Sequence, residues 1–217
     1  MKKFKLTSEF IVDISGVKLF RIKALIEFGN VKAGDLGGYI EKEENLSHMG
    51  DAWVSGDARI SGDAQVFGDA WVFGNARVFG NARVSGDAWV FGDAQVFGNA
   101  RVFGNAWVSG NARVFGDAQV SGNARVSGNA RVFGDAQVSG DARVSGDKDY
   151  AYAHGFGSCN RTTTFFRLKD GDVGVRCGCF YGTLAQFRDK VCETHGETKK
   201  AQEYLMLADL MEIRFKN

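Results

Sequence analysis

The sequence predicts a mainly β protein whose centre is a parallel β-helix with three short strands in each coil. Two observations carry this prediction. Residues 50–145 form sixteen consecutive hexads of the form Gly-(Asp/Asn)-Ala-x-(Val/Ile)-(Ser/Phe), without any insertion. The four tryptophans of the chain recur every 18 residues, which is the length of three hexads. Self-similarity at a fixed short period is the signature of a solenoid.

Each hexad combines a corner with a short strand. Gly followed by Asp or Asn favours a corner, because Gly adopts positive φ freely and Asp and Asn tolerate the left-handed region. The next three residues, Ala-x-(Val/Ile), alternate between one face and the other, as residues of a strand do. The chain has no Pro, as expected for strands that pair on both edges and need every backbone N–H.

Aromatic residues fix the number of strands per coil. With three strands per coil, all four tryptophans lie above one another on one face: Trp53, Trp71, Trp89 and Trp107. Phe73 and Phe91 lie beside them, and the neighbouring face carries a second column of Phe79, Phe97, Phe115 and Phe133. Soluble monomers rarely expose apolar patches of this size, so these residues predict self-association. A purely structural stack of rings is the alternative interpretation.

Residues 1–49 are predicted to form an N-terminal β-hairpin cap, because the end of a solenoid exposes unpaired strand edges. Two apolar runs, residues 10–14 and 17–22, flank Ser15-Gly16. This arrangement is typical of a two-stranded hairpin. Residues 34–40 then lead into the first coil. The β-helix itself is expected to span residues 50–147.

After residue 147 the pattern changes, and residues 148–217 predict a small C-terminal α+β module of the form ββαα. Residues 162–168 and 173–177 flank an Asp-Gly-Asp turn and predict a second hairpin. Thr183 and Thr198 are candidate N-caps for helices over residues 184–193 and 199–215.

The sixteen hexads resemble the hexapeptide-repeat proteins, which fold as a left-handed parallel β-helix and include many acyltransferases. In that family a branched aliphatic residue begins each hexad and a small residue follows four positions later, as Val54 and Ala58 do here. The resemblance implies the left hand and an assembly into parallel trimers that use two adjacent faces of each subunit. Residues 21–49 and 160–215 resemble segments of phage-encoded proteins, which implies a phage or prophage origin.

Acyl transfer is the enzymatic alternative. The resemblance implies a His base, near a loop extruded between coils, in a site formed between subunits. Here the hexads contain neither a His nor an extruded loop, and general-base catalysis needs a titratable group held against a pocket. We therefore expect no enzymatic activity, and His48 or His154 would be the base if the alternative held.

Four residues of the C-terminal module have the spacing of zinc ligands. Cys177, Cys179, Cys192 and His195 form Cys-x-Cys, twelve residues, then Cys-x-x-His, a donor set that suits tetrahedral zinc. The alternative is that Cys177 and Cys179 pack as small apolar side chains. In the phage module that this segment resembles, positions 159 and 192 are not usually Cys, which implies that Cys159 and Cys192 lie near each other. Apart from this structural zinc, no cofactor is expected.

The composition of the chain limits the kinds of partner that we expect. A formal net charge of +1 gives no electrostatic reason to expect nucleic acid, and stacking of nucleobases on the aromatic columns is the weaker alternative. No apolar run is long enough to span a membrane. Four Cys without a secretion signal indicate a reducing bacterial cytoplasm.

These observations together predict a non-enzymatic, self-associating scaffold of phage or prophage origin. Its C-terminal module is expected to be the recognition head for a host protein or a small-molecule ligand. The alternatives are an acyltransferase with an intersubunit site and a structural component of a virion or tail.

Overall fold

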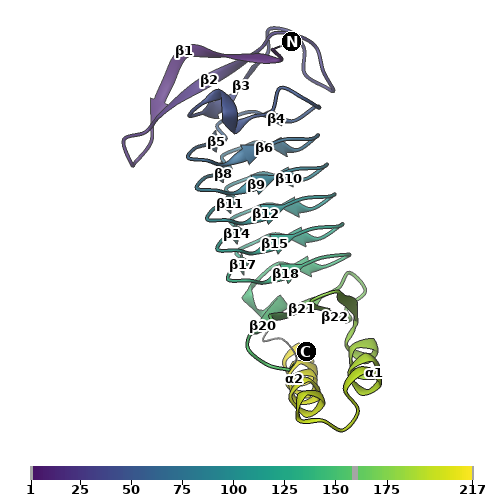
Figure 1. Ribbon diagram of the computed structural model, residues 1–217. Helices are drawn as coiled ribbons and strands as arrows, with labels where there is room; N and C mark the ends of the chain where they lie inside the picture. The colour runs from purple at the N-terminus through teal and green to yellow at the C-terminus, as the bar shows by residue number, and fades with distance from the viewer. Residues whose placement is uncertain (1, 158–160, 217) are drawn as a thin grey trace.

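A computed structural model describes residues 2–157 and 161–216 and shows an elongated stack of coils (Figure 1). The N-terminal strands cover one end of the stack, and a small sheet with two helices covers the other. The predicted mainly β fold, with a solenoid between an N-terminal hairpin and a C-terminal α+β part, is confirmed. Among the described residues, no helix has the length and apolar character needed to cross a membrane.

Each hexad contributes one two-residue strand, and every strand pairs in parallel with the strand 18 residues away. The first face, called here the tryptophan sheet, contains β4 (Trp53–Val54), β7 (Trp71–Val72), β10 (Trp89–Val90), β13 (Trp107–Val108), β16 (Arg125–Val126) and β19 (Arg143–Val144). The second, the phenylalanine sheet, contains β5 (Arg59–Ile60), β8 (Arg77–Val78), β11 (Gln95–Val96), β14 (Arg113–Val114) and β17 (Arg131–Val132). The third sheet contains β6 (Gln65–Val66), β9 (Arg83–Val84), β12 (Arg101–Val102), β15 (Gln119–Val120) and β18 (Gln137–Val138).

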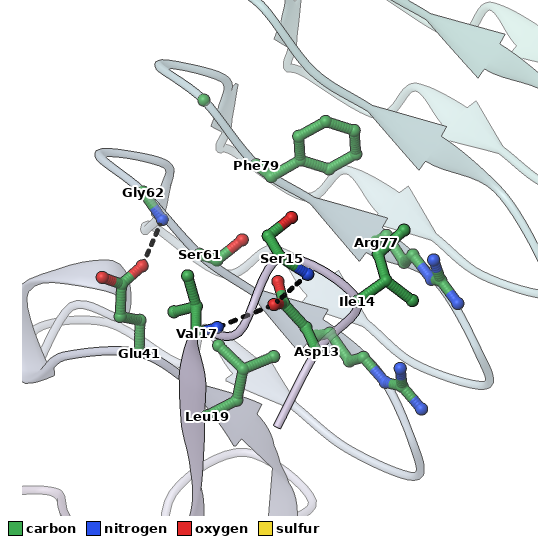
Figure 2. Close-up of a pocket in the computed structure, with 12 residues that line it drawn as sticks. Asp13, Ile14, Ser15, Val17, Leu19, Glu41, Ser61, Gly62, Arg77 and Phe79 are labelled. Atoms are coloured by element: carbon green, nitrogen blue, oxygen red, sulfur yellow. Dashed lines mark hydrogen bonds between the residues drawn. The ribbon is translucent and has the colours of Figure 1, made fainter. Parts of the chain in front are cut away.

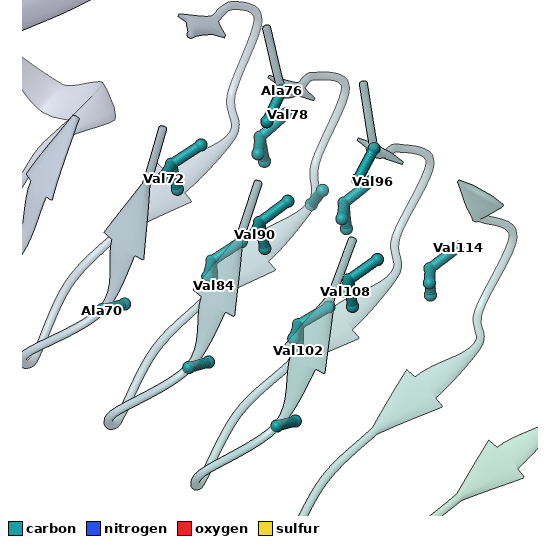
Figure 3. Packing of buried hydrophobic residues seen from close by; sticks show 14 of the residues in the cluster. Ala70, Val72, Ala76, Val78, Val84, Val90, Val96, Val102, Val108 and Val114 are labelled. Carbon is teal, nitrogen blue, oxygen red and sulfur yellow. The ribbon is translucent and has the colours of Figure 1, made fainter. Parts of the chain in front are cut away.

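The core is a narrow column of Val and Ala side chains, one pair per hexad, all essentially inaccessible to solvent (Figure 3). The corners explain the invariant Gly. The sixteen hexad glycines have φ between 59° and 72°. A Cβ on Gly86 would lie 2.9 Å from the backbone N of Gly104 in the next coil. Both the backbone angle and the close approach of the coils therefore exclude a side chain at these corners.

The N-terminal hairpin consists of β1 (Phe4–Val12) and β2 (Lys18–Ala24). This confirms the predicted hairpin, although its first strand begins well before the predicted apolar run. A strand that was not predicted, β3 (Leu36–Ile40), pairs antiparallel with β2 and parallel with β5. The hairpin therefore extends the phenylalanine sheet beyond the first coil. A 3-10 turn, η1 (Glu43–Asn45), follows β3.

The C-terminal module begins after the 3-10 turn η2 (Asp147–Asp149). Its antiparallel sheet contains, in order, β20 (Tyr150–Ala153), β21 (Thr163–Arg167), β22 (Val173–Cys177) and β23 (Phe180–Thr183). The predicted hairpin corresponds to β21 and β22, but the ββαα description was incomplete. β20 and β23 were missed because each has only four residues and neither shows a clear alternation of apolar and polar residues.

Two helices complete the module, α1 (Leu184–His195) and α2 (Lys199–Phe215). Both predicted N-caps are confirmed, since the hydroxyls of Thr183 and Thr198 accept the N–H groups of Gln186 and Ala201. α1 runs two residues past its predicted end and stops at Gly196, whose φ is 55°. The helices pack on the sheet around Phe165 and form a second cluster of buried residues.

Candidate functional site

The tryptophan sheet holds its four indoles in one register. Successive β-pairings place each Trp opposite the next one, as the 18-residue spacing predicted: Trp53, Trp71, Trp89 and Trp107. The rings of Trp89 and Trp107 stack with centroids 5.3 Å apart. Beside them Phe73 and Phe91 stack at 4.9 Å and also meet the indoles edge-on, at 5.9 and 6.2 Å. The six residues thus lie in one aromatic column, and the rings of Phe73, Phe91, Trp89 and Trp107 contact one another within it.

The ends of this column are covered, which corrects the expectation that all four tryptophans face outward. Trp53 is only 3% exposed, because the Phe28 ring of the N-terminal segment packs edge-on against it at 5.4 Å. At the other end the Arg125 guanidinium lies 4.4 Å from the centre of the Trp107 ring. Trp89, 39% exposed, is the most accessible indole. Arg125 follows Trp107 by 18 residues, so the repeat period would have revealed this contact.

The phenylalanine sheet carries a second column that is stacked more regularly. Phe79, Phe97, Phe115 and Phe133 are separated by 4.8, 4.9 and 5.3 Å between successive ring centres, with nearly parallel planes. Tyr150 and Tyr152 close its lower end by edge-to-face contacts with Phe133. Neighbouring rings stack face to face on one another, so their edges point outward. A nucleobase would therefore find no free ring face between these residues on which to stack.

The third sheet differs from the other two. Its outward aromatic residues are Phe67 and Phe103, 38% and 37% exposed, and Ser85 separates them in the column. Two adjacent faces of the solenoid therefore carry aromatic columns with stacked rings, and the remaining face carries isolated rings.

A cleft of about 380 Å³ opens where the turn of the β1–β2 hairpin hangs over the phenylalanine sheet (Figure 2). Asp13 holds this turn, because its Oδ1 accepts the N–H groups of Ser15 and Val17 at 2.8 and 2.9 Å. Val17 and Leu19 line the cleft from the hairpin side, opposite Phe79. Sequence analysis did not find this cleft, since the overhang depends on how the hairpin continues the sheet.

The cleft combines apolar side chains with two cations. Arg59 and Arg77 lie side by side in register on β5 and β8, and neither guanidinium makes a hydrogen bond or ion pair with another described residue. Glu41, the carboxylate nearest the sheet, accepts the N–H of Gly62 at 2.6 Å. Ile14, at the tip of the turn, is 94% exposed. The overhanging turn and the phenylalanine sheet therefore present a recess with an apolar rim to an approaching molecule.

Comparison with known families finds one similarity, and it lies in the solenoid. The YdcK β-solenoid repeat matches residues 76–92, 94–110, 106–122, 118–134 and 136–147. These stretches are similar to that repeat. The matched stretches lie within the coils from β8 onward and leave both terminal parts unmatched. Comparison with curated proteins found no match.

The sixteen hexads contain no Cys or His, and the candidate zinc ligands lie outside them. Cys177, Cys179 and His195 line one small pocket, but Cys192 does not. Cys192 is exposed, whereas its neighbour Val191 faces the core, so the phase of α1 turns the thiol away. Within residues 2–157 and 161–216, no three His, Cys, Asp or Glu side chains are grouped to hold a metal ion. The predicted four-ligand set is therefore not assembled.

The Cys177 thiol is engaged in contacts with polar side chains instead. The Cys177 Sγ accepts a hydrogen bond from the Thr163 hydroxyl at 3.2 Å and lies 3.8 Å from the Tyr204 hydroxyl. Cys177 is half-buried, as the packing alternative expected, whereas Cys179 is exposed at the turn between β22 and β23. The predicted proximity of Cys159 and Cys192 falls outside the described residues, because Cys159 is not among them.

The two candidate bases lie at opposite ends of the solenoid. His48 belongs to the N-terminal end, where its ring stacks on Phe4 at 4.3 Å and its Nδ1 accepts the backbone N–H of Lys3. His154 lies beyond the last coil, with its Nδ1 2.9 Å from the Thr162 hydroxyl and 4.0 Å from an Asp135 carboxylate oxygen. The first is thus part of the packing at the solenoid end, and the second is well exposed.

Proposed function

We propose that this protein is a non-enzymatic, self-associating scaffold of phage or prophage origin, and that it works in the bacterial cytoplasm. The observation that carries the proposal is the pair of aromatic columns on two adjacent faces of the solenoid. Apolar patches of this kind mark interaction sites in soluble proteins. The three described thiols, Cys177, Cys179 and Cys192, are free, which supports a reducing compartment.

In the proposed assembly, the tryptophan sheet of one subunit meets the phenylalanine sheet of the next. Such a contact is heterologous, and it closes into a ring when the rotation between subunits divides a full turn. A three-sided prism that uses two adjacent faces closes after three subunits, so the proposed assembly is a parallel trimer. The recess under the β1–β2 hairpin would receive the edge of the neighbouring subunit, with Ile14 as its apolar tip.

The C-terminal module is the proposed recognition head for a host protein. α2 exposes three large apolar side chains at the spacing of one helical face, Met206, Leu210 and Ile213, with 71%, 55% and 70% of each residue exposed. Grooves that bind helices recognise residues at this spacing. The stripe lies opposite the buried face of α2, which packs on the sheet through Tyr204, Ala208 and Met211.

The proposal is tested by the mass of the particle in solution. We expect light scattering to report a multiple of the single-chain mass for the wild type and a smaller mass for Trp89→Ser. Phe103→Ser is the matched control, because Phe103 is as exposed as Trp89 but lies on the third sheet. A wild type that stays at the single-chain mass at all concentrations would overturn the proposal, as would an equal effect of both substitutions.

A further inference from the structure

The C-terminal module encloses a pocket of about 220 Å³ between the β22–β23 hairpin and the two helices. Its floor is apolar and firmly packed. Phe187 and Val191 of α1 are buried in the second cluster of buried residues, and Phe180 contacts the Phe187 ring at 5.5 Å. Tyr204 meets the same ring edge-on at 5.6 Å. The floor therefore exists without a ligand, as is usual for small-molecule sites.

The rim of the pocket is basic. Arg161 and Lys190 line it together with the His195 imidazole, and none of the described residues that line it is an Asp or Glu. Arg161 makes no hydrogen bond or ion pair with another described residue. Lys190 has one exposed partner, Glu193, at 2.9 Å, and exposed pairs of this kind are weak. Among the described residues, the Arg161 guanidinium thus has no carboxylate partner, and Lys190 has only an exposed one.

We propose that this pocket binds a small organic anion, a carboxylate or a phosphate ester attached to one aromatic or branched apolar group. The apolar group would rest on Phe187 and Val191, and the anionic group would meet Arg161 and Lys190. The hydroxyl of Thr194, which also lines the pocket, offers a hydrogen bond to the same group. The pocket is smaller than the roughly 300 Å³ at which sites for drug-sized ligands begin, which limits the ligand to about one ring.

This inference adds a ligand to the C-terminal module and does not depend on self-association. A guanidinium forms bidentate hydrogen bonds with carboxylate and phosphate, so Arg161 is the specificity-determining residue. The apolar floor excludes inorganic anions as good ligands, because they would leave it solvated without compensation.

The cysteines of the module supply a built-in probe. Cys177 and Cys179 line the pocket and Cys192 does not, so the rate of alkylation by neutral iodoacetamide reports occupancy at each thiol. The probes are phenyl phosphate and phenylacetate, with inorganic phosphate and benzyl alcohol as controls that lack the ring or the charge. At ten times the Kd, about one site in eleven is empty. Alkylation of Cys179 should then slow about tenfold, while Cys192 reacts at an unchanged rate.

A pair of variants separates binding from a general effect on the thiols. Arg161→Gln should abolish the protection by both probes, whereas Lys200→Gln, an exposed residue of α2 outside the pocket, should keep it. Unchanged alkylation of Cys179 with millimolar probe would overturn the proposal. So would equal protection of Cys192, or full protection in Arg161→Gln. None of these results changes the particle mass, so they are distinguishable from a failure of the proposed assembly.

Discussion

The two ends of the solenoid expose opposite halves of the same hydrogen bond. Backbone N–H groups in each coil donate to carbonyls of the following coil, as Trp53 N does to Ala70 O. The first coil is therefore left with unpaired acceptors, and the last coil with unpaired donors. Buried backbone groups without partners are costly, so the two terminal parts must supply opposite chemistry.

The N-terminal end is covered by donors. The Lys3 ammonium and the Asn45 amide are both fully buried, and each donates to two carbonyls of the first coil: Gly50 and Ala52 for Lys3, Gly62 and Ala64 for Asn45. The backbone N–H of Tyr39 donates to Ala58 at the remaining corner. All three corners of the first coil are thus capped by groups that carry N–H.

The C-terminal end is covered by acceptors. Carboxylates of the η2 turn and a hydroxyl of β21 receive the free N–H groups at 2.9 Å: Asp147 from Arg131, Asp149 from Ser145, and Thr164 from Gln137. A parallel solenoid therefore needs two different caps, with hydrogen-bond donors at its N-terminal end and acceptors at its C-terminal end. The ends also carry opposite charges at these positions, which gives them different responses to pH.

Removal of the Asn45 amide should have the largest effect. Asn45→Ala leaves two buried carbonyls without donors, and each such group costs about 1–3 kcal/mol. We expect the free energy of unfolding, measured by denaturant titration, to fall by about 3 kcal/mol. Asn81→Ala is the matched control, because Asn81 is exposed and its side-chain amide donates to the exposed Asn99 side chain rather than to a buried carbonyl. Equal losses in both variants would contradict a special role of the end.

The Lys3 ammonium should give the N-terminal end an alkaline pH dependence. Burial lowers the pKa of Lys3 to about 8, although Asp51 and Asp69 oppose the shift. Between about pH 8 and 10.4, the unfolded chain then holds more protons at this residue than the folded chain. The free energy of unfolding therefore rises with pH in this window, by at most about 3 kcal/mol.

The C-terminal end should respond in acid instead. Burial on its own would raise the pKa of Asp149, but hydrogen bonds from Ser145 and Gly146 outweigh it and lower the pKa. The stabilisation from Asp149 is present above the unfolded pKa of about 3.9 and is lost as the pH falls through the folded value. Lys3→Met should remove the alkaline rise alone, and Asp149→Asn should alter the acid limb alone. A change of both the acid and the alkaline pH dependence in either variant would contradict separate pH responses of the two ends.

Tyr150 limits the pH range in which the contribution of Lys3 to the free energy of unfolding can be measured. Burial raises the pKa of this phenol, so its contribution to stability is lost above the unfolded value of about 10. Denaturation between about pH 8 and 9.5 isolates Lys3 from that effect.

Repetition made the solenoid predictable. The inward positions are Ala and Val or Ile in all sixteen hexads, so one strand determines the others, and the tryptophan spacing sets three strands per coil. Thr183 and Thr198 are local signals, since an N-cap bonds within three residues of itself. These parts of the fold follow from short-range rules and were predicted from the sequence.

Residues whose roles depend on distant partners were not predictable. Lys3 and Asn45 are residue types that normally lie at the surface, and only the position of the first-coil carbonyls explains their burial. The cover over Trp53 comes from Phe28, which no repeat relates to it. The zinc prediction relied on spacing alone, whereas the direction of Cys192 is set by the packing of Val191 in α1. The binding pocket of the C-terminal module likewise depends on β23, which the sequence did not reveal.

The smallest effect is expected when the two ends are brought closer together. Deletion of residues 110–127 removes one whole coil and joins Ser109 to Gly128, so that every remaining strand keeps its sheet. In a solenoid each repeat contacts only its neighbours, and distant sites add within about 0.5 kcal/mol. Asn45→Ala should therefore cost the same in the shortened chain as in the full one, within that margin. Deletion of three residues, 111–113, is the control, because it misplaces one corner and should prevent folding. A cost of Asn45→Ala that depends on the number of coils would mean that the ends are coupled through the column of Val and Ala.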